Sequence, residues 1–431
     1  MEPRAWAPGG RRGGVARPTA EARRAAAQAL PAALPGVLTA TLLALAALLL
    51  AGCGAPGVGS GDDAGRTARN VVSGTAVSAA AVAIAPADGA TDVATSGTLK
   101  VTASGGELSS VVVKDASGLT VPGAISADGA VWAPTARLRT ATAYTVDATA
   151  RDSRGRESDR HSAFTTVVPD DTFVGFVTPQ DGAEVGVGME VWLHFNRAVT
   201  DRAAVARGLT VTAAPPVAVA AKWYGDQDVY LRPQKFWAPG TRVTLAVDLA
   251  GVRAAPGVYG RQRESVHFTV ARSQVSVVDA ARHTMSVYRD GRLLRALPVT
   301  AGVPGHDTPG GTLVIAEKYG RTRMTGDTAG FGGEYDIPDV PHAMRLTTSG
   351  TFLYGDYWSP PAVFGTADTS HGGIGLRDAR GGADSAAPAA WFFANSLVGD
   401  VVEVTGGSGR SVQWYNGLNG WNLDWPQWTA L

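Results

Sequence analysis

Short alternating runs of apolar and polar residues dominate the chain from about residue 78 onward. Alternation with a period of two is typical of half-buried β-strands. Asp88-Gly89 and Asp128-Gly129 are residue pairs that close tight turns between strands. The first such runs lie at 98–103, 109–114, 130–132 and 143–150. We therefore predict an immunoglobulin-like β-sandwich over residues 78–168.

The block at 169–271 repeats the plan of the block before it. Matching turn and strand residues about 100 positions apart indicate a tandem repeat, so we predict a second immunoglobulin-like sandwich here. Three histidines occur singly at spacings that suit no metal ion, and we expect no metal or cofactor site: His161, His194 and His267. The repeated residues are Pro86, Asp88, Gly89, Ala90 and Phe164-Thr165, which recur as Pro179, Asp181, Gly182, Ala183 and Phe268-Thr269.

The block at 272–406 also begins with alternating strands. A glycine-rich stretch at 319–342 then interrupts the alternation, and one helix is predicted near 388–397. The predicted strands lie at 274–278, 284–288, 292–300 and 401–405. The expected fold class is mainly β, with two sandwiches followed by a β-rich domain that has one main helix.

A tryptophan-rich extension ends the chain at 407–431. Trp414, Trp421, Trp425 and Trp428 lie there among Asn, Gly and Asp residues. We expect these rings to pack at a domain junction, and the alternative is an aromatic platform for a glycan.

The N-terminal residues are typical of an export signal. Six arginines with two acidic residues precede an apolar run at 34–50, which ends in Leu50-Ala51-Gly52-Cys53. We predict a lipoprotein signal peptide over 1–53 with lipidation of Cys53, and a flexible linker over 54–77. The expected location is the cell wall, on the outer face of the cytoplasmic membrane. A plain transmembrane anchor is the alternative.

Composition adds two exclusions. The 431 residues contain 38 basic and 38 acidic side chains, which provides no electrostatic reason to expect nucleic acid as a partner. Cys53 is the single cysteine of the sequence. An intramolecular disulfide and a catalytic thiol elsewhere in the chain are therefore excluded.

The run at 369–376, Thr-Ser-His-Gly-Gly-Ile-Gly-Leu, resembles the Ser-His-Gly-Cys signature of the L,D-transpeptidase family. Members of this family are secreted bacterial enzymes that crosslink peptidoglycan through a cysteine acyl-enzyme. The resemblance implies that Ser370, His371 and Gly372 are retained and that Gly373 replaces the nucleophilic cysteine. The hairpin at 276–288 and the turn at 308–312 also resemble elements of the transpeptidase domain.

The segment at 349–358 resembles the family segment that carries the catalytic histidine shortly before a tryptophan. Tyr354 occupies the histidine position, with Trp358 behind it. A phenol with a pKa of about 10 is a poor base near neutral pH. Ser370 with His371 as its base is disfavoured, because adjacent residues of an extended loop point to opposite sides.

By this resemblance the sandwiches are similar to the immunoglobulin-like domains that precede the catalytic domain in actinobacterial L,D-transpeptidases. We expect a catalytically inactive envelope lipoprotein that binds or remodels peptidoglycan through its stem peptides, or that regulates an envelope protein partner. The first alternative is an active transpeptidase that forms 3-3 crosslinks by an unrecognised route. The second is a structural spacer.

Overall fold

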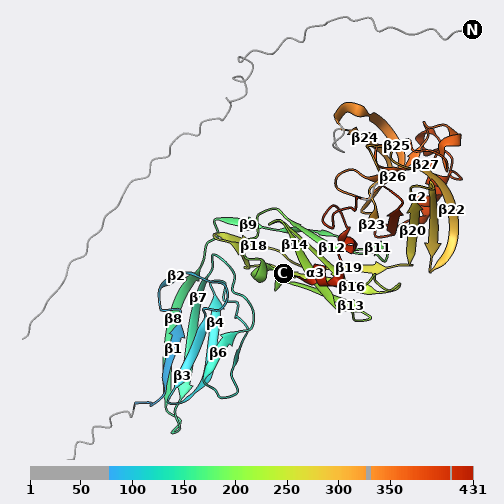
Figure 1. Ribbon diagram of the computed structural model, residues 1–431. Coiled ribbons are helices and arrows are strands. Elements are labelled where there is room, and N and C mark those ends of the chain that lie inside the picture. The colour runs from blue at the N-terminus through green and yellow to red at the C-terminus, as the bar shows by residue number, and fades with distance from the viewer. Residues whose placement is uncertain (1–76, 327–331, 408–409, 431) are drawn as a thin grey trace, which may run out of the picture. The chain divides into compact units, whose positions relative to one another are not determined.

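The computed structural model describes residues 77–326, 332–407 and 410–430. These residues fold mainly into β-strands, arranged as two sandwiches and a C-terminal β-sheet domain with one main helix (Figure 1). The predicted fold class is thereby confirmed. The predicted signal peptide, Cys53 and nearly all of the predicted linker lie outside the described residues.

The first sandwich consists of two four-stranded sheets, with the orders β1-β3-β6-β5 and β2-β8-β7-β4. Alternate side chains of the strands fill the space between the sheets, where Val101, Val113 and Val146 are fully buried beside Trp132. The strands are β1 (Ala81–Ala85), β2 (Ala90–Val93), β3 (Lys100–Ser104), β4 (Glu107–Asp115), β5 (Gly123–Ile125), β6 (Val131–Pro134), β7 (Ala143–Arg151) and β8 (Glu157–Thr166).

The second sandwich also has two four-stranded sheets, with the orders β10-β12-β15-β14 and β11-β19-β16-β13. A small sheet of β17, β18 and β9 and the short helix α1 (Arg202–Ala206) complete it. The strands are β9 (Asp171–Phe173), β10 (Gly175–Thr178), β11 (Ala183–Val185), β12 (Val191–Phe195), β13 (Leu209–Ala214), β14 (Val219–Tyr224), β15 (Asp228–Pro233), β16 (Arg242–Asp248), β17 (Arg253–Ala255), β18 (Val258–Gly260) and β19 (Arg263–Val270).

The residues that repeat in the sequence form the same turn in both sandwiches. The carboxylate of Asp88 accepts a hydrogen bond from the backbone N–H of Ala163 at 2.7 Å, and Asp181 accepts one from His267 at 2.8 Å. The glycine that follows each aspartate has a φ of 76°, a conformation that favours glycine. Each turn leads into a strand that pairs in parallel with the last strand of its sandwich.

The third domain is built on a nine-stranded mixed sheet with the order β23-β28-β20-β21-β22-β27-β26-β25-β24. Helix α2 (Pro388–Asn395) packs against β25, β26 and β27, and its Phe392 is buried in the core. The strands are β20 (Gln274–Asp279), β21 (Thr284–Arg289), β22 (Arg292–Thr300), β23 (Gly311–Val314), β24 (Glu317–Thr325), β25 (Asp336–Arg345), β26 (Phe352–Asp356), β27 (Ile374–Arg377) and β28 (Val401–Thr405).

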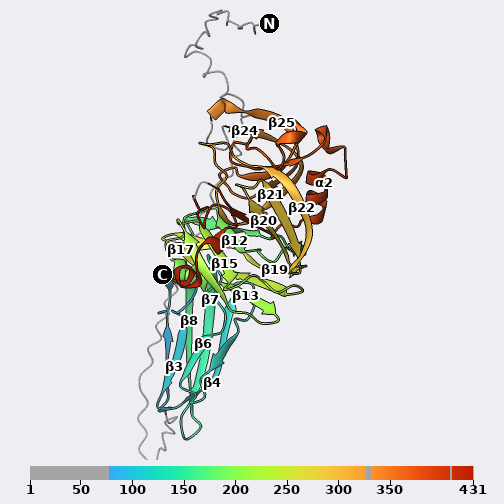
Figure 2. The same cartoon turned by 45° about the vertical axis from the view of Figure 1, so that its right-hand side comes forward.

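The glycine-rich stretch is more regular than the sequence predicts. Strands β24 and β25 pair as a long antiparallel hairpin, visible at the edge of the sheet in Figure 2. A short 3-10 turn, η3 (Gly332–Glu334), leads into β25. The expectation of an irregular excursion over 319–342 is therefore wrong for these two strands. Their backbone N–H and C=O groups pair with each other across the hairpin, and this pairing does not require a strong alternation of apolar residues.

The C-terminal extension packs against the second sandwich, and its last turns form η6 (Gly420–Asn422) and α3 (Trp425–Thr429). The buried guanidinium of Arg232 lies 4.6 Å from the centroid of the Trp421 ring and 4.3 Å from that of Trp428. The indole N–H of Trp421 donates to the Gly188 carbonyl, and that of Trp428 donates to the Ala220 carbonyl. Both tryptophans therefore serve packing at a junction, as expected, and not as an exposed platform.

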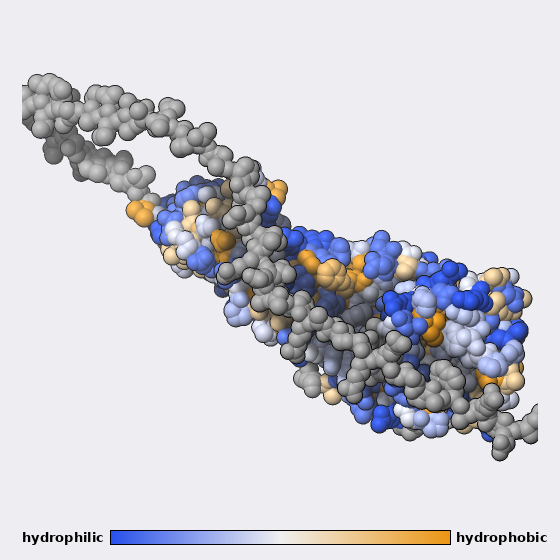
Figure 3. All heavy atoms as spheres, turned by 90° about the horizontal axis from the view of Figure 1, so that it is seen from above, coloured by the Kyte–Doolittle hydropathy of each residue, from blue (hydrophilic) through white to orange (hydrophobic). Residues whose placement is uncertain are grey.

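The face drawn in Figure 3 is mostly hydrophilic, and its apolar residues form small separate patches. Within the described part of the chain, no helix is both long enough and apolar enough to span a membrane.

Candidate functional site

The motif segment 369–373 borders a cavity of about 150 Å³ in the third domain. The other walls come from the β24–β25 hairpin and from β26. The lining is largely aromatic and apolar, with a few polar groups at one side. The lining residues are Met324, Tyr335, Ile337, Gly350, Phe352, Tyr354, Trp358, Thr369, Ser370, His371 and Gly373. The structure thus brings together the two segments that the resemblance singles out.

Gly373 and Tyr354 compete for the same space. A Cβ atom placed on Gly373 would lie 2.8 Å from the Cε1 atom of the Tyr354 ring and 3.0 Å from the carbonyl oxygen of Phe352. Gly373 is not among the residues with a positive φ, so its backbone suits an ordinary L-residue, and the obstacles are the ring and, less severely, the Phe352 carbonyl oxygen. The assignment of these positions to the family's cysteine and histidine stays a prediction from the sequence.

Tyr354 is held as a packing residue. Its ring belongs to a small hydrophobic cluster under the β24–β25 hairpin and stacks on Trp358 at 5.7 Å between centroids. Burial raises the pKa of the Tyr354 phenol far above its usual value, and the nearby Asp356 acts in the same direction. A phenol that holds its proton so firmly cannot serve as a general base near neutral pH.

Ser370 is engaged in fixing the motif loop. Its side chain is buried, and its hydroxyl donates a hydrogen bond to the Gly373 carbonyl at 2.7 Å. The hydroxyl of Thr308 donates to the same carbonyl at 3.1 Å. Gly372 has a φ of 90°, which favours glycine at that position. Ser370 therefore positions the loop and is not directed at a substrate.

His371 lies beside two residues that the sequence analysis did not consider. The Nε2 atoms of His371 and of His306 each lie 3.4 Å from the Oε2 atom of Glu334. The centroids of the two imidazole rings are 4.9 Å apart. These side chains come from three separate segments, so no spacing in the sequence could reveal the cluster. Two imidazoles and a carboxylate are a donor set that suits a transition-metal ion.

A buried carboxyl group lies directly behind Tyr354. One oxygen of Asp356 accepts hydrogen bonds from the backbone N–H groups of Trp358 and Ser359, at 3.2 and 2.9 Å. The other oxygen has no hydrogen-bond partner among the described residues. Burial raises the pKa of the Asp356 carboxyl, with the hydrogen bonds from Ser359 and Trp358 opposing the shift.

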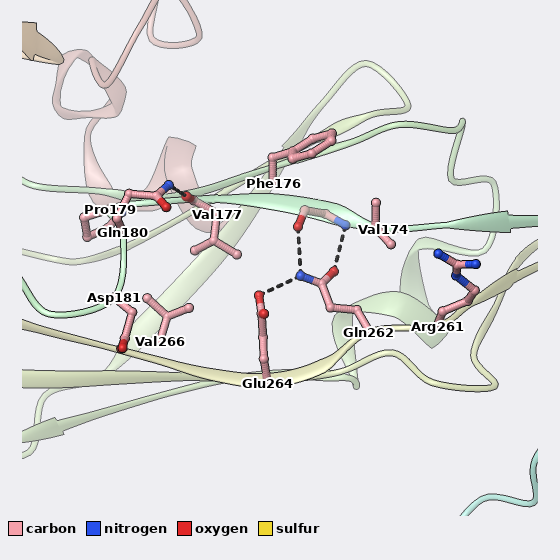
Figure 4. A pocket seen from close by; sticks show the side chains of 11 residues that line it. Val174, Phe176, Val177, Pro179, Gln180, Asp181, Arg261, Gln262, Glu264 and Val266 are labelled. Atoms are coloured by element: carbon pink, nitrogen blue, oxygen red, sulfur yellow. Dashed lines mark hydrogen bonds between the residues drawn. The ribbon is translucent and has the colours of Figure 1, made fainter.

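A larger hollow, of about 580 Å³, lies on the second sandwich (Figure 4). There the side-chain amide of Gln262 exchanges two hydrogen bonds with the backbone of Gly175, at 2.8 and 2.9 Å, and donates a third to Glu264. These contacts link the edges of the two sheets. The hollow therefore reflects how the sandwich is joined at one edge, where the polar groups of Gln262, Gly175 and Glu264 are already paired with each other.

Comparisons with known proteins agree with this architecture. Residues 90–253 match the model of a bacterial Ig domain, and residues 273–404 match the model of the L,D-transpeptidase catalytic domain. The fold and the position of the motif loop beside a cavity thus define a multidomain protein with a C-terminal domain of the transpeptidase type.

Comparison with individual proteins identifies the family of this chain. L,D-transpeptidase 2 of Mycobacterium tuberculosis is 32% identical over 348 residues, which cover 80% of this chain and 82% of the relative. L,D-transpeptidase 5 of the same species is 30% identical over 353 residues, covering 80% and 75%. A solved structure of LdtMt1 in complex with imipenem is 29% identical, covers 55% of this chain and 100% of that one, and has a TM-score of 0.45. The chain belongs to the L,D-transpeptidase family.

The contact between Tyr354 and Gly373 predicts strong coupling between the two positions. Gly373→Ala should lower the free energy of unfolding by about 1–3 kcal/mol, because the new methyl group overpacks against the ring. In a Tyr354→Ala background the same change should cost much less, because only the contact with the Phe352 carbonyl oxygen remains, so a double-mutant cycle should return a clear coupling energy. Chemical denaturation followed by circular dichroism measures all four proteins. Gly320→Ala, with no atom within 4 Å of its new methyl group, is the control. Additive effects would contradict the shared-space interpretation.

Proposed function

We propose that this chain is an envelope lipoprotein of the L,D-transpeptidase family that binds peptidoglycan stem peptides and does not form an acyl-enzyme. Enzymes of the family act on peptidoglycan stem peptides. In this proposal the protein is exported and held by lipid on Cys53 at the outer face of the cytoplasmic membrane.

The observation that carries the proposal is the packing of the Tyr354 ring against Gly373, the position that the resemblance assigns to the nucleophile. A side chain on Gly373 would meet the Tyr354 ring at 2.8 Å, and the sequence offers no cysteine beyond Cys53. Acyl transfer through a thiol needs a thiolate and a neighbouring base. Both positions now carry residues that pack against each other, which supports the loss of acyl transfer.

The cavity that remains supports a binding role. Its volume of about 150 Å³ is similar to that of cavities which hold a benzene-sized group in other proteins. It therefore suits one small side chain of a peptide and not a whole peptide. Trp358 is 40% exposed at this cavity and offers an aromatic surface to a bound chain.

Binding to purified sacculi tests this role. We expect the wild-type protein to be retained by sacculi and Trp358→Ala to bind about tenfold more weakly, which corresponds to a loss of about 1.4 kcal/mol. Phe176→Ala is the control, because Phe176 is 62% exposed on the second sandwich. Absence of wild-type retention would leave the protein as a spacer. Equal weakening by both variants would place binding outside the cavity.

Restoration of the reactive groups tests the loss of chemistry. Gly373→Cys combined with Tyr354→His should create a thiol that imipenem acylates, whereas the wild type should gain no adduct. Gly373→Cys alone should react at least about 10³-fold more slowly, because it lacks the partner base and clashes with the tyrosine ring. Intact-mass spectrometry detects the adduct. An adduct on the wild type would favour surviving activity by another route, and no adduct on a folded double variant would show that the groove no longer accepts the ligand.

Lipidation of Cys53 is tested by metabolic labelling with a fatty-acid probe. The wild type should be labelled and should be recovered with membranes. Cys53→Ala should lose both the label and the recovery with membranes, because the thiol is the acceptor of the lipid. Comparable expression of the two proteins, checked by immunoblot, controls for degradation. Persistent labelling of Cys53→Ala would exclude this anchor.

A further inference from the structure

Two imidazole side chains converge on one carboxylate oxygen at the rim of the cavity. The Nε2 atoms of His306 and His371 lie each 3.4 Å from the Oε2 atom of Glu334, and the three ligand atoms lie within 4.8 Å of one another. Each of these two distances is longer than a normal N–H···O hydrogen bond of about 2.7–3.2 Å. The two contacts are therefore ion-pair contacts and not tight hydrogen bonds.

The two distances fit the geometry of a bound metal ion. Zinc binds imidazole nitrogen and carboxylate oxygen at about 2.0–2.2 Å in a tetrahedral arrangement. Two ligand atoms of such a tetrahedron lie about 3.3–3.6 Å apart, by simple geometry from those bond lengths. The distances from the Glu334 oxygen to both histidine nitrogens fall in this range.

The backbone holds the two histidines together before any ion binds. The loop that carries His306 forms a parallel bridge with the motif segment, where Gly302 pairs with Ser370. The backbone N–H of Val303 donates to the Ser370 carbonyl at 2.9 Å, and that of His306 donates to the Val303 carbonyl at 2.8 Å. Two of the three ligands thus lie on segments that are fixed to each other, which lowers the entropic cost of binding a metal ion.

The third ligand comes from a different part of the domain. Glu334 ends the η3 turn that leads into β25, so a bound ion would tie the hairpin to the motif loop. Glu334 is 48% exposed, and an ordinary ion pair at such an exposed position contributes little to stability. Ion pairing alone would therefore contribute little free energy toward holding the two histidines beside the same oxygen.

We propose that His306, His371 and Glu334 form a binding site for a divalent transition-metal ion of the zinc type. Three protein ligands leave one position of a tetrahedral ion open for water or for another donor. His371 also lines the cavity, so the ion would lie at its rim. The ion would therefore lie beside the cavity to which we assign peptide binding, but zinc binding itself can be measured without a peptide or an acyl donor.

Titration with zinc alone tests the site. The experiment uses the full chain without an affinity tag and with Cys53→Ser, so that neither tag nor thiol competes for the ion. Calorimetry should show one zinc ion per chain, and cobalt in its place should give the visible absorption of a tetrahedral complex. Zinc in excess should raise the melting temperature, since an ion that binds the folded state stabilises it.

Variants locate the bound ion. Glu334→Gln, His306→Gln and His371→Gln should each weaken zinc affinity more than about 100-fold, because loss of a direct ligand exceeds the 10- to 100-fold effect of an outer-shell change. His283→Ala is the control, since His283 lies in the same domain and pairs with a different carboxylate, Asp368. Circular dichroism without zinc checks that every variant is folded. Absence of stoichiometric binding by the parent protein, or wild-type affinity in folded Glu334→Gln and His306→Gln, would overturn the proposal.

Discussion

The space between Gly373 and Tyr354 constrains the whole site. A Cβ at position 373 would approach the ring to 2.8 Å, so a side chain at 373 requires that the Tyr354 ring or the surrounding backbone shift. The ring is also part of the hydrophobic cluster under the β24–β25 hairpin, together with Phe352. The tyrosine therefore stabilises the hairpin through burial of an aromatic ring at the place where the resemblance expects a reactive pair. The residues at the two positions are therefore coupled through this contact.

A second constraint joins the C-terminal extension to the second sandwich. Arg232 is buried between Trp421 and Trp428, and the fully buried Glu190 lies nearby. Burial raises the pKa of Glu190 to about 8, while Arg232 opposes the shift. The Glu190 carboxylate lies within 2.9 Å of where a Cβ of Gly420 would stand, so only glycine fits the tail there. The buried Arg232 guanidinium needs the faces of Trp421 and Trp428 beside it. This requirement fixes the position of the extension along the sandwich more sharply than apolar packing alone.

The sequence predicts the parts of this protein that depend on local patterns. The strands β20, β21 and β22 follow from alternation, and the repeated turns of the sandwiches follow from their Asp-Gly pairs. The β24–β25 hairpin does not, because its edge strand β24 lacks a clear apolar face. The approach of Tyr354 to Gly373 and the cluster at His371 are also beyond a single sequence, because both arise from tertiary contacts between distant segments.

The contacts on the two sides of the motif loop are chemically consistent with each other. On one side the Tyr354 ring lies against Gly373, and on the other two imidazoles and a carboxylate converge. A thiolate is a strong zinc ligand. A cysteine two residues from His371 would therefore compete with water for the fourth coordination position of an ion held there. A sulfur bound in this way is neutralised by the metal and is withdrawn from acyl transfer. In the proposed zinc site, a glycine at 373 would leave the open coordination position to water or to an external donor.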